Sequence, residues 1–517
     1  MASRLRLADL LAGLSLIADT GYGLSPGHAM RSCLVAVSLA RKLGLAESEV
    51  SDTFYTSLLF HVGCVGFSHE LSAAFGDDIA ANRAGARTNF ADPRDIFATL
   101  IPQTTQGLPP MARARATAFI TLRGRAFGRR YDTTVCEVAR HTARRIGLPD
   151  SVQRSLYEVR EWWNGGGAPQ GLRGEQILLP ARIARLATDA VLFADIEDAQ
   201  LAVAALRHRA GGILDPSLVE EFAGSAQALL TEVSTGDPRE KVLAAEPQPL
   251  VEKEIAELPE VAAAFGELVD LKTPFTHGHS GRVAGLAKAA AATLGFDAAT
   301  AHRLHVAAFL HDIGRVGVPN SVWEKTGPLT SVEWEQVRMH PYHSERILAM
   351  AQTLEPMARL AGMHHERLDG SGYYRGCRAG DLTPAARVLA AAEAFQTMTE
   401  ERPHRPAVDL QRAAEKLRGG AQSGALDPDA VAAVIDAAGQ RGGRRLRPAD
   451  LSAREVEVLR MMARASTNRE IAQLLSISPR TAEHHVQHIY AKIGVSSRSA
   501  AALFAIEHDL LPPPKDG

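Results

Sequence analysis

Side chains able to bind metal ions recur through the middle of the chain. The pair His311-Asp312 follows an apolar run and is closed by Gly314. A carboxylate has two oxygens and can bridge two cations, while the neighbouring imidazole binds one of them. The pair alone is weak evidence. Further residues of metal-ligand type lie at intervals that folded helices can bring together, and with the pair they predict a metal centre. These residues are His279, His340, His364, His365 and Glu393.

A glycine-rich, turn-forming segment, HERLDGSGYYRG, follows the histidine pair at 365–376. Together with other short motifs in the same order, it resembles the HD-GYP family of metal-dependent phosphohydrolases over residues 255–440. The other motifs that carry the resemblance are Gly278-His279-Ser280, His311-Asp312-Ile313-Gly314, His340-Pro341 and Arg387-Val388.

This resemblance implies a centre of two divalent ions. One ion would be bound by His279, His311, Asp312 and Glu393, and Asp312 would bridge to a second ion bound by His340, His364 and His365. Two such ions, roughly 3.5–4 Å apart, activate a water for in-line attack on phosphorus and stabilise the leaving oxygen. Mixed imidazole and carboxylate ligation suits iron or manganese.

Besides Asp312, two arginines are candidate catalytic residues. Arg315 and Arg378 stand where the family typically has lysine, and either guanidinium could hold phosphate oxygens in a bidentate contact. Surface ion pairing is the alternative for both.

The family hydrolyses cyclic di-GMP, so the resemblance implies a cyclic dinucleotide as substrate. Three positions depart from the family pattern. Glu393 replaces an aspartate, Tyr374 replaces the proline of the Gly-Tyr-Pro signature, and Phe275 replaces a glutamate that some members use for a third metal. These departures leave open a catalytically weak or inactive sensor domain.

Residues 1–235 are predicted to be a degenerate second copy of the same domain. Pro26-Gly27-His28 parallels His277-Gly278-His279, and Glu161 precedes Arg182 by the same 21 residues that separate Glu366 from Arg387. In this copy Val62 is predicted to replace the bridging carboxylate, and Val159-Arg160 the histidine pair. Valine cannot bind a cation and arginine repels one, so no metal centre is expected here. A metal-free pocket or a surface that pairs with the second copy remain alternatives.

Three helix starts follow near the C-terminus. Ser452 and Thr467 each open a capping box, and Ser478-Pro479 offers an N-cap with a first-turn proline. Two short helices, a tight turn and a polar third helix describe a helix-turn-helix.

Residues 449–512 closely resemble the LuxR-type DNA-binding domain, which implies DNA as a partner. Because residues 449–511 balance seven Lys/Arg against seven Asp/Glu, affinity would depend on helix N-termini, nearby arginines and dimerisation. A protein-docking bundle is the alternative. The candidate DNA contacts are Arg469, Arg480, Thr481, His484, Gln487, His488, Lys492 and Arg498.

The whole chain fits an all-α protein. Its 517 residues are 46% hydrophobic and only 5% aromatic, and the net charge of −2 excludes a global polycation. Four scattered cysteines and the lack of a signal peptide or an apolar span of about 20 residues predict a cytoplasmic protein without membrane contact. The expected order is a degenerate HD-like domain (1–235), a linker (236–254), the HD-GYP-like domain (255–440), a linker (441–448) and the helix-turn-helix (449–512). Paired half-sites favour a homodimer.

Overall fold

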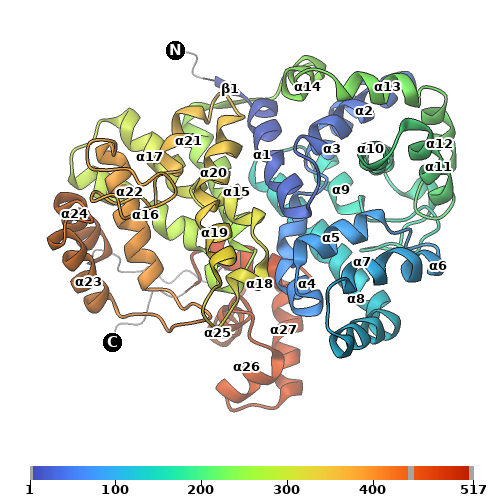
Figure 1. The fold of residues 1–517 in the computed structure, drawn as a ribbon. Helices are drawn as coiled ribbons and strands as arrows, with labels where there is room; N and C mark the ends of the chain where they lie inside the picture. The colour runs from blue at the N-terminus through green and yellow to red at the C-terminus, as the bar shows by residue number, and fades with distance from the viewer. Residues whose placement is uncertain (1–3, 440–447, 512–517) are drawn as a thin grey trace. The chain divides into compact units, whose positions relative to one another are not determined.

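The computed structural model describes residues 4–439 and 448–511, and its regular structure is almost entirely helical, which confirms the all-α prediction. A short ribbon of two strands, β1 (Arg4–Arg6) and β2 (Glu252–Glu254), pairs antiparallel. The chain divides into two compact units between Ile255 and Ala256, and Figure 1 traces the helices of each.

The first unit contains α1 to α14. Its helices are α1 (Leu7–Tyr22), α2 (His28–Lys42), α3 (Glu47–Leu58), η1 (Val62–Phe67), α4 (Ser68–Phe75), α5 (Asp78–Arg87), α6 (Pro93–Asp95), η2 (Ile96–Leu100), α7 (Ile101–Thr105), α8 (Pro110–Arg145), α9 (Asp150–Glu158), η3 (Gly174–Gln176), α10 (Leu179–Ile196), α11 (Ala199–Arg209), α12 (Pro216–Ala223), α13 (Ala226–Ser234) and α14 (Pro238–Ala245).

The second unit contains the HD-like lobe and then the helix-turn-helix. After η4 (Ile255–Glu257), which spans the boundary, its helices are α15 (Leu258–Asp270), η5 (Pro274–Thr276), α16 (His279–Thr293), α17 (Ala298–Leu310), η6 (Ile313–Gly317), α18 (Asn320–Trp323), α19 (Ser331–Arg338), α20 (His340–Ala349), α21 (Glu355–Ala361), α22 (Pro384–Met398), α23 (Leu410–Gln422), α24 (Pro428–Gly439), η7 (Pro448–Asp450), α25 (Ala453–Met462), α26 (Asn468–Leu474), α27 (Pro479–Ile493) and α28 (Arg498–Glu507).

Small aliphatic side chains form the core of the HD-like lobe. Alanines predominate where α16, α17, α22 and α24 pack together, with fully buried leucines and valines such as Leu304, Leu389 and Val434 between them. Alanine side chains let helix axes approach closely, and burial of the larger residues stabilises the packing by about 1.5–3 kcal/mol each. The close packing sets the helices that carry the candidate ligands at fixed positions.

The two units repeat several local features. Gly27 and Gly278 cap α2 and α16 with φ of 81° and 75°. Before each cap, a buried aspartate accepts hydrogen bonds from the first amides of the helix: Asp19 from Gly27 N and Ala29 N, and Asp270 from Ser280 N. These matching contacts support the interpretation of the first unit as a second copy of the fold.

The glycine-rich loops of the two units are also alike. Glu161 accepts from three successive backbone amides at 170–172, and Glu366 accepts from the amides of Arg375 and Cys377. Each loop includes a cis peptide bond, Ala168–Pro169 in the first unit and Tyr373–Tyr374 in the second.

One predicted register is wrong. A Cβ on Gly63 would lie 2.0 Å from the carbonyl oxygen of Val135, and a Cβ on Gly314 would lie 2.1 Å from that of His340. The two glycines therefore occupy matching places, each where a helix backbone passes. This match puts His61, rather than Val62, at the position of Asp312, because each residue stands two before its glycine.

The segment 236–254 is ordered and is not the linker predicted for it. Asp237 caps α14 by accepting from Arg239 N, Pro238 occupies the first helical position, and Val242 is fully buried. The Asp-Pro pair is therefore a helix start rather than part of a linker. The linker predicted at 441–448 lies, except for Pro448, outside the described residues.

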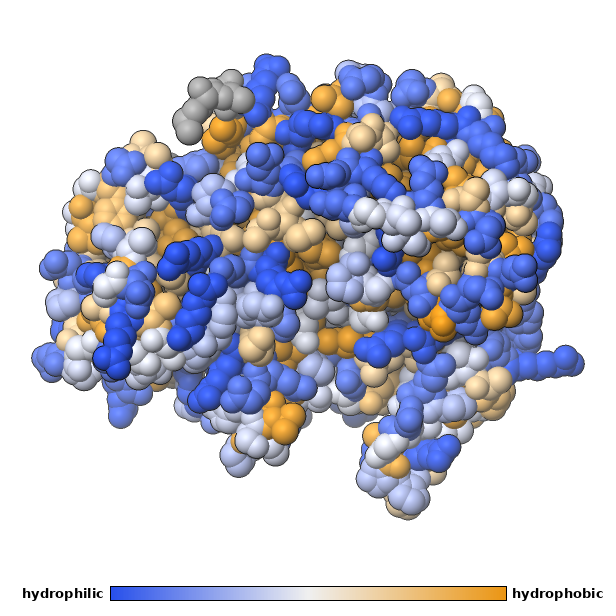
Figure 2. All heavy atoms as spheres, turned by 45° about the horizontal axis from the view of Figure 1, so that its top comes forward, coloured by the Kyte–Doolittle hydropathy of each residue, from blue (hydrophilic) through white to orange (hydrophobic). Residues whose placement is uncertain are grey.

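One stretch, Glu47–Phe75, has the length and hydropathy of a membrane span, and 67% of it is buried inside the structure. It is divided among α3, η1 and α4, so it forms part of a folded core. On the face drawn in Figure 2, hydrophilic side chains surround scattered hydrophobic ones.

Gly314→Ala should loosen the contact between η6 and α20. The new methyl group would meet the carbonyl oxygen of His340 and the amide nitrogen of Ser344, at 2.1 and 2.5 Å, and such overpacking costs about 1–3 kcal/mol. Hydrogen exchange of α20 amides, followed by mass spectrometry, should quicken about tenfold or more.

Gly419→Ala is the matched control for this prediction. Gly419 is an exposed residue in α23 with open space beside it, so alanine should stabilise that helix by up to about 1 kcal/mol. The α20 amides of this control should exchange at the wild-type rate. Unchanged exchange of the α20 amides in Gly314→Ala would contradict the close packing described for η6 and α20.

Candidate metal centre and nucleic-acid interface

Four histidines and two carboxylates converge inside the HD-like lobe. Asp312 Oδ1 lies 3.2 Å from His340 Nε2 and 3.5 Å from His364 Nε2, and its Oδ2 lies 3.7 Å from Nε2 of both His279 and His311. Glu393, from α22, places Oε2 at 2.9 Å from His279 Nε2 and 3.2 Å from His311 Nε2. All six side chains are buried, and Asp312 lies between the two histidine pairs.

Outer hydrogen bonds fix the orientation of these rings. Nδ1 of His311, His340 and His364 each contacts the carbonyl oxygen three residues earlier, at 2.8, 2.6 and 2.6 Å. A ring that donates from Nδ1 to a carbonyl keeps its lone pair on Nε2, and this arrangement is typical of metal-bound histidines. The Nε2 atoms therefore face the centre as acceptors.

The converging lone pairs require a cation. Nε2 of His340 and Nε2 of His364 lie 3.0 Å apart, yet both protons are assigned to Nδ1, so the two lone pairs repel each other unless a positive charge lies near them. Among the described residues, Asp312 Oδ1, Glu393 Oε2 and Nε2 of His279 and His311 have no hydrogen-bond partner. The donor set therefore fits metal ions.

The candidate ligands form two groups, each compact enough to bind one ion. His340, His364 and His365 make one group, and His279, His311 and Asp312 make the other. The structure thus brings together the ligand residues predicted from the sequence, with Glu393 beside the second group.

Electrostatics keep the carboxylates ionised. Burial alone would raise the pKa of Asp312, but the charges of His311 and Arg315 hold it well below its usual value. The pKa of Glu393 is lowered in the same way, against burial, by His279 and His311. An ionised carboxylate is the form that binds a cation.

The histidines respond differently to their surroundings. Burial lowers the pKa of His364 to about 4, so this ring is neutral near pH 7. Burial would also lower the pKa of His279, but Glu400 and Glu393 on its two sides raise it to about 10. A proton on His279 thus compensates carboxylate charge that bound metal ions would otherwise balance.

Of the two arginines predicted to hold phosphate, Arg315 lies at the centre. Its Nη1 is 3.3 Å from Asp312 Oδ2, and its guanidinium lies 3.8 Å from the centroid of the Trp323 ring. Trp323 Nε1 in turn donates to the carbonyl of Arg315 at 3.2 Å. The side chain of Arg378 is exposed and contacts none of the ligand residues among the described contacts, so the structure does not bring it into the cluster.

Sequence reasoning missed three residues that shape the site. Glu400 accepts from His279 Nδ1 at 2.8 Å and pairs with Arg282. Trp323 positions Arg315 as described. Arg367, immediately after His365-Glu366, is largely buried and interacts with Glu393 and Tyr373. Only Arg367 had a signal in the sequence, its place two residues after the histidine pair.

The first unit has an arginine where the second has a ligand. Arg160 precedes Glu161 as His365 precedes Glu366, and it is buried, with its guanidinium 5.4–5.7 Å from the ring centroids of Tyr22, Phe60 and Tyr131. Burial, Arg160 and His28 lower the pKa of His61 well below its usual value. The fixed positive charge of the buried Arg160 guanidinium would repel a metal ion at this place.

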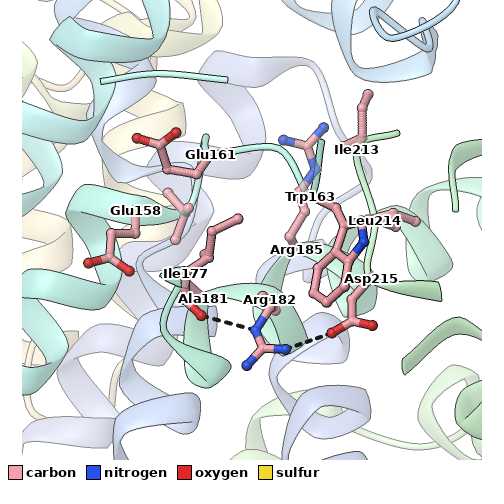
Figure 3. Close-up of a pocket in the computed structure, with 11 residues that line it drawn as sticks. Glu158, Glu161, Trp163, Ile177, Ala181, Arg182, Arg185, Ile213, Leu214 and Asp215 are labelled. Atoms are coloured by element: carbon pink, nitrogen blue, oxygen red, sulfur yellow. Dashed lines mark hydrogen bonds and ion pairs between the residues drawn. The ribbon is translucent and has the colours of Figure 1, made fainter. Parts of the chain in front are cut away.

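The first unit also has a small, partly open cavity, whose lining residues are shown in Figure 3. Its volume is about 10 Å³, which is roughly the room that one water molecule needs. Arg182 crosses its edge, donating to the carbonyl of Ile177 and to Asp215 Oδ2 at 2.7 Å. In the second unit Arg387 makes the corresponding pair with Asp427 at 2.9 Å. The cavity is too small for a nucleotide.

The C-terminal helices form the predicted helix-turn-helix. Ser452 and Thr467 make capping boxes at α25 and α26, and Ser478 caps α27 with Pro479 in its first turn. Ala482, Val486 and Ile489 are buried on the inner side of α27. The predicted contacts that are exposed are Arg469, Arg480, Thr481, His484, Gln487, His488 and Lys492.

Two of the predicted phosphate contacts hold the domain together. Lys492 Nζ pairs with Glu455 Oε2 at 2.7 Å and donates to the carbonyl of Asp450 at 3.1 Å. Arg498 donates to Ser466 O at 2.6 Å and to Asn468 Oδ1 at 2.7 Å. Their charge still contributes to the surface, but their donors have intramolecular partners that the sequence did not reveal.

The buried histidine–carboxylate centre on a helical lobe defines a metal-dependent phosphohydrolase of the HD type, followed by a DNA-binding module. The family described as HD domain matches residues 264–430, and the family described as bacterial regulatory proteins, luxR family, matches residues 449–505. Both matches lie within the domains predicted from the sequence.

Individual relatives agree with this class. The chain is 30% identical to 3′3′-cGAMP-specific phosphodiesterase 3 of Vibrio cholerae over 431 residues, which cover 83% of this chain and 94% of that protein. It is 32% identical to a cyclic di-GMP phosphodiesterase of Thermotoga maritima over 179 residues, 34% of this chain and about half of the relative. A crystal structure of a cyclic GMP-AMP specific phosphodiesterase from V. cholerae superposes with a TM-score of 0.58 at 27% identity, covering 85% of this chain and 99% of that one. The chain belongs to the HD-domain phosphodiesterase family.

Asp312→Asn should empty the centre of metal. The amide keeps the shape but loses the negative charge between the two histidine pairs, so both groups of ligands lose their shared anion. After loading with manganese or iron and desalting, elemental analysis should show metal in wild type and little in the variant. Asp297→Asn, at the exposed cap of α17, is the control and should retain metal, because asparagine caps a helix as well as aspartate does. Metal retained by Asp312→Asn would contradict this assignment.

Proposed function

We propose that the HD-like lobe hydrolyses a cyclic dinucleotide with two bound divalent ions, and that the C-terminal module binds DNA, so that a second messenger is coupled to transcription. The observation that carries the proposal is the inward convergence of four imidazole Nε2 atoms on Asp312, with Glu393 closing one side. Such a donor set serves iron or manganese better than a metal that prefers thiolates.

The chemistry required is hydrolysis of a phosphodiester. The oxygen of water bonds to phosphorus, the bond from phosphorus to the ribose 3′ oxygen breaks, and the proton of water is transferred to that leaving oxygen. Bound divalent ions would activate the water and neutralise the charge of the phosphate. Asp312 and the histidines would hold these ions.

The protein's own cation beside the centre is Arg315. Its guanidinium is held between Asp312 and the face of Trp323, so it is oriented before a substrate arrives. A planar guanidinium can donate two parallel hydrogen bonds to the non-bridging oxygens of a phosphate. Arg315 would therefore position the phosphodiester, whereas Arg378 would act only on a part of the ligand farther from the cluster.

Cyclic GMP-AMP is the first substrate to test, and cyclic di-GMP the second. The relative named for 3′3′-cGAMP aligns over 83% of this chain, whereas the Thermotoga cyclic di-GMP enzyme aligns over 34%. The tyrosine stacked on His365, Tyr373, has its ring centroid 4.7 Å away at an interplanar angle of 27°. An aromatic face at this position offers stacking to a purine base.

The exposed polar residues of α27 would contact the base edges of DNA. Arg480, Thr481, His484, Gln487 and His488 lie on its outer side, and a helix of this kind enters the major groove. Binding as a homodimer to paired half-sites follows the usual geometry of such modules. Binding to DNA would require that the chain is cytoplasmic. The alternative, a lobe that senses its ligand without turnover, keeps the same DNA-binding output.

Arg315→Gln should reduce hydrolysis of cyclic GMP-AMP much more than Arg315→Lys does. Glutamine removes the charge, whereas lysine keeps it and matches the residue typical at this position. Loss of one such charged contact in a transition state costs about 2.7–4 kcal/mol, or about 10²–10³ in kcat. The assay compares purified metal-loaded proteins by chromatography of the linear product, with cyclic di-GMP run in parallel. Wild-type protein with full metal and no turnover of either substrate would favour the sensor alternative.

Gln487→Ala and His484→Ala should weaken sequence-specific DNA binding by about tenfold or more, since a base contact contributes roughly 1–3 kcal/mol. DNA fragments selected by the wild-type chain would be titrated in gel-shift experiments. Gln422→Ala, an exposed substitution at the end of α23, is the control and should bind like wild type. If all variants bind equally, α27 is not the reading helix and the docking alternative gains support.

A further inference from the structure

All the charged residues in the first half of α8 are basic. Between Pro110 and Tyr131 the helix has six arginines and no acidic residue, and all six arginines are exposed. These residues, which we call the α8 arginine face, are Arg113, Arg115, Arg123, Arg125, Arg129 and Arg130.

The charge of the α8 arginine face is not compensated by the fold. None of its six side chains has an ion pair or hydrogen bond within the described part of the chain, in contrast to Arg182, which is paired with Asp215, and Arg207, which is paired with Glu220. Arg129 alone has acidic neighbours close enough to affect their pKa, Asp132 and Glu161. A folded protein usually spaces such charges with acids, so this run calls for an external partner.

The α8 arginine face extends along the axis of one continuous helix. At about 1.5 Å per residue, Arg113 and Arg130 are roughly 26 Å apart along α8, which is labelled in Figure 1. Arg115, Leu122 and Arg129 follow one another at intervals of seven residues and so share one side of the helix. Leu122 is 82% exposed and Met111 is 79% exposed, which shows that this side is uncovered by the unit itself.

Charge decides which partner fits. A second copy packed on this side would set arginines against arginines, and an apolar partner would leave the guanidiniums without counter-charges. A polyanion with regularly spaced charges would supply counter-charges to the guanidiniums without bringing like charges together. Duplex DNA is such a polyanion, with one phosphate per roughly 1.7 Å of axis. The helix-turn-helix, with seven basic and seven acidic residues over 449–511, has no excess charge of its own to supply that attraction.

We propose that the α8 arginine face binds the phosphate backbone of duplex DNA independently of sequence and so supplies the electrostatic part of the affinity that the charge-balanced helix-turn-helix lacks. The inference rests on the DNA-binding part of the proposed function. It assigns to the first unit a role in holding DNA that needs no metal and no ligand in that unit.

The test is the salt dependence of binding to a random-sequence duplex by the full chain. Each phosphate contact adds about 0.9 to the slope of log K against log salt. The triple variant Arg115→Gln, Arg123→Gln, Arg125→Gln should therefore lower that slope by about 2–3, as measured by fluorescence anisotropy. The variant leaves Arg129 in place because of its acidic neighbours.

The matched control removes three exposed charges elsewhere. Arg412→Gln, Lys416→Gln and Arg418→Gln lie on α23 of the other unit and are likewise exposed without an ion pair among the described residues. The control should keep the wild-type slope, and both triple variants should keep the wild-type circular dichroism and hydrolysis rate. An unchanged slope in the α8 variant would overturn the inference.

Two further arms separate the possible failures. Gln487→Ala tests the helix-turn-helix on selected DNA, so failure of that module is seen apart from failure of α8. Vesicles of phosphatidylcholine and phosphatidylserine test a membrane surface as the occupant. If the α8 variant loses vesicle binding while its slope of log K for DNA against log salt stays unchanged, the DNA assignment is overturned. If that slope falls in the α8 variant although Gln487→Ala has no effect on selected DNA, α8 binds DNA without help from the helix-turn-helix.

Discussion

The structure depends on one electrostatic constraint, the meeting of four imidazole Nε2 atoms and two carboxylates among buried side chains. Nε2 of His340 and of His364 are only 3.0 Å apart, and Asp312 lies between them and the pair His279 and His311. Buried acceptors without donors are costly, so positive charge at the centre, from metal ions or from the proton on His279, stabilises this arrangement. The surrounding helices serve that requirement, because each histidine is fixed from behind by a carbonyl or by Glu400.

The hydrogen bonds behind the rings explain why the ligands are spread along the sequence. His311 and His364 each follow the last turn of a helix, where a carbonyl three residues earlier lacks a helical partner, and each ring satisfies one of these carbonyls. His340 does the same after α19. The ends of α17, α19 and α21 therefore provide both the ligand and the acceptor that orients it. A ligand at the middle of a helix, such as Glu393, needs a different partner, and Thr397 supplies it at 2.5 Å.

Local sequence patterns predicted the parts that are decided by neighbouring residues. The capping boxes at Ser452 and Thr467 and the ligand histidines came from short motifs, and the structure brings those residues into place. The partners that pair across long separations could not be found in this way. Glu400 meets His279 from 121 residues away, and Lys492 meets Glu455 from 37. Their types fit many surface positions, so only the packing of the helices selects them. The linker prediction at 236–254 was wrong for a local reason, because an Asp-Pro pair such as Asp237-Pro238 is common both in turns and at helix starts.

The first unit keeps the scaffold of the second with different residues at some positions of the ligands. It keeps the capping glycine, the buried aspartate before it and the amides around Glu161, which are contacts of the backbone and do not depend on a metal ion. At the position of His365 it places Arg160, whose guanidinium among three aromatic rings supplies a fixed positive charge. A covalently attached cation satisfies the same need for positive charge near the centre of the helices and cannot dissociate. The surface of the first unit is then free to change. The six arginines in the first half of α8 are one such feature, and α19 and α20 of the second unit, which must admit a substrate, have no comparable run of arginines.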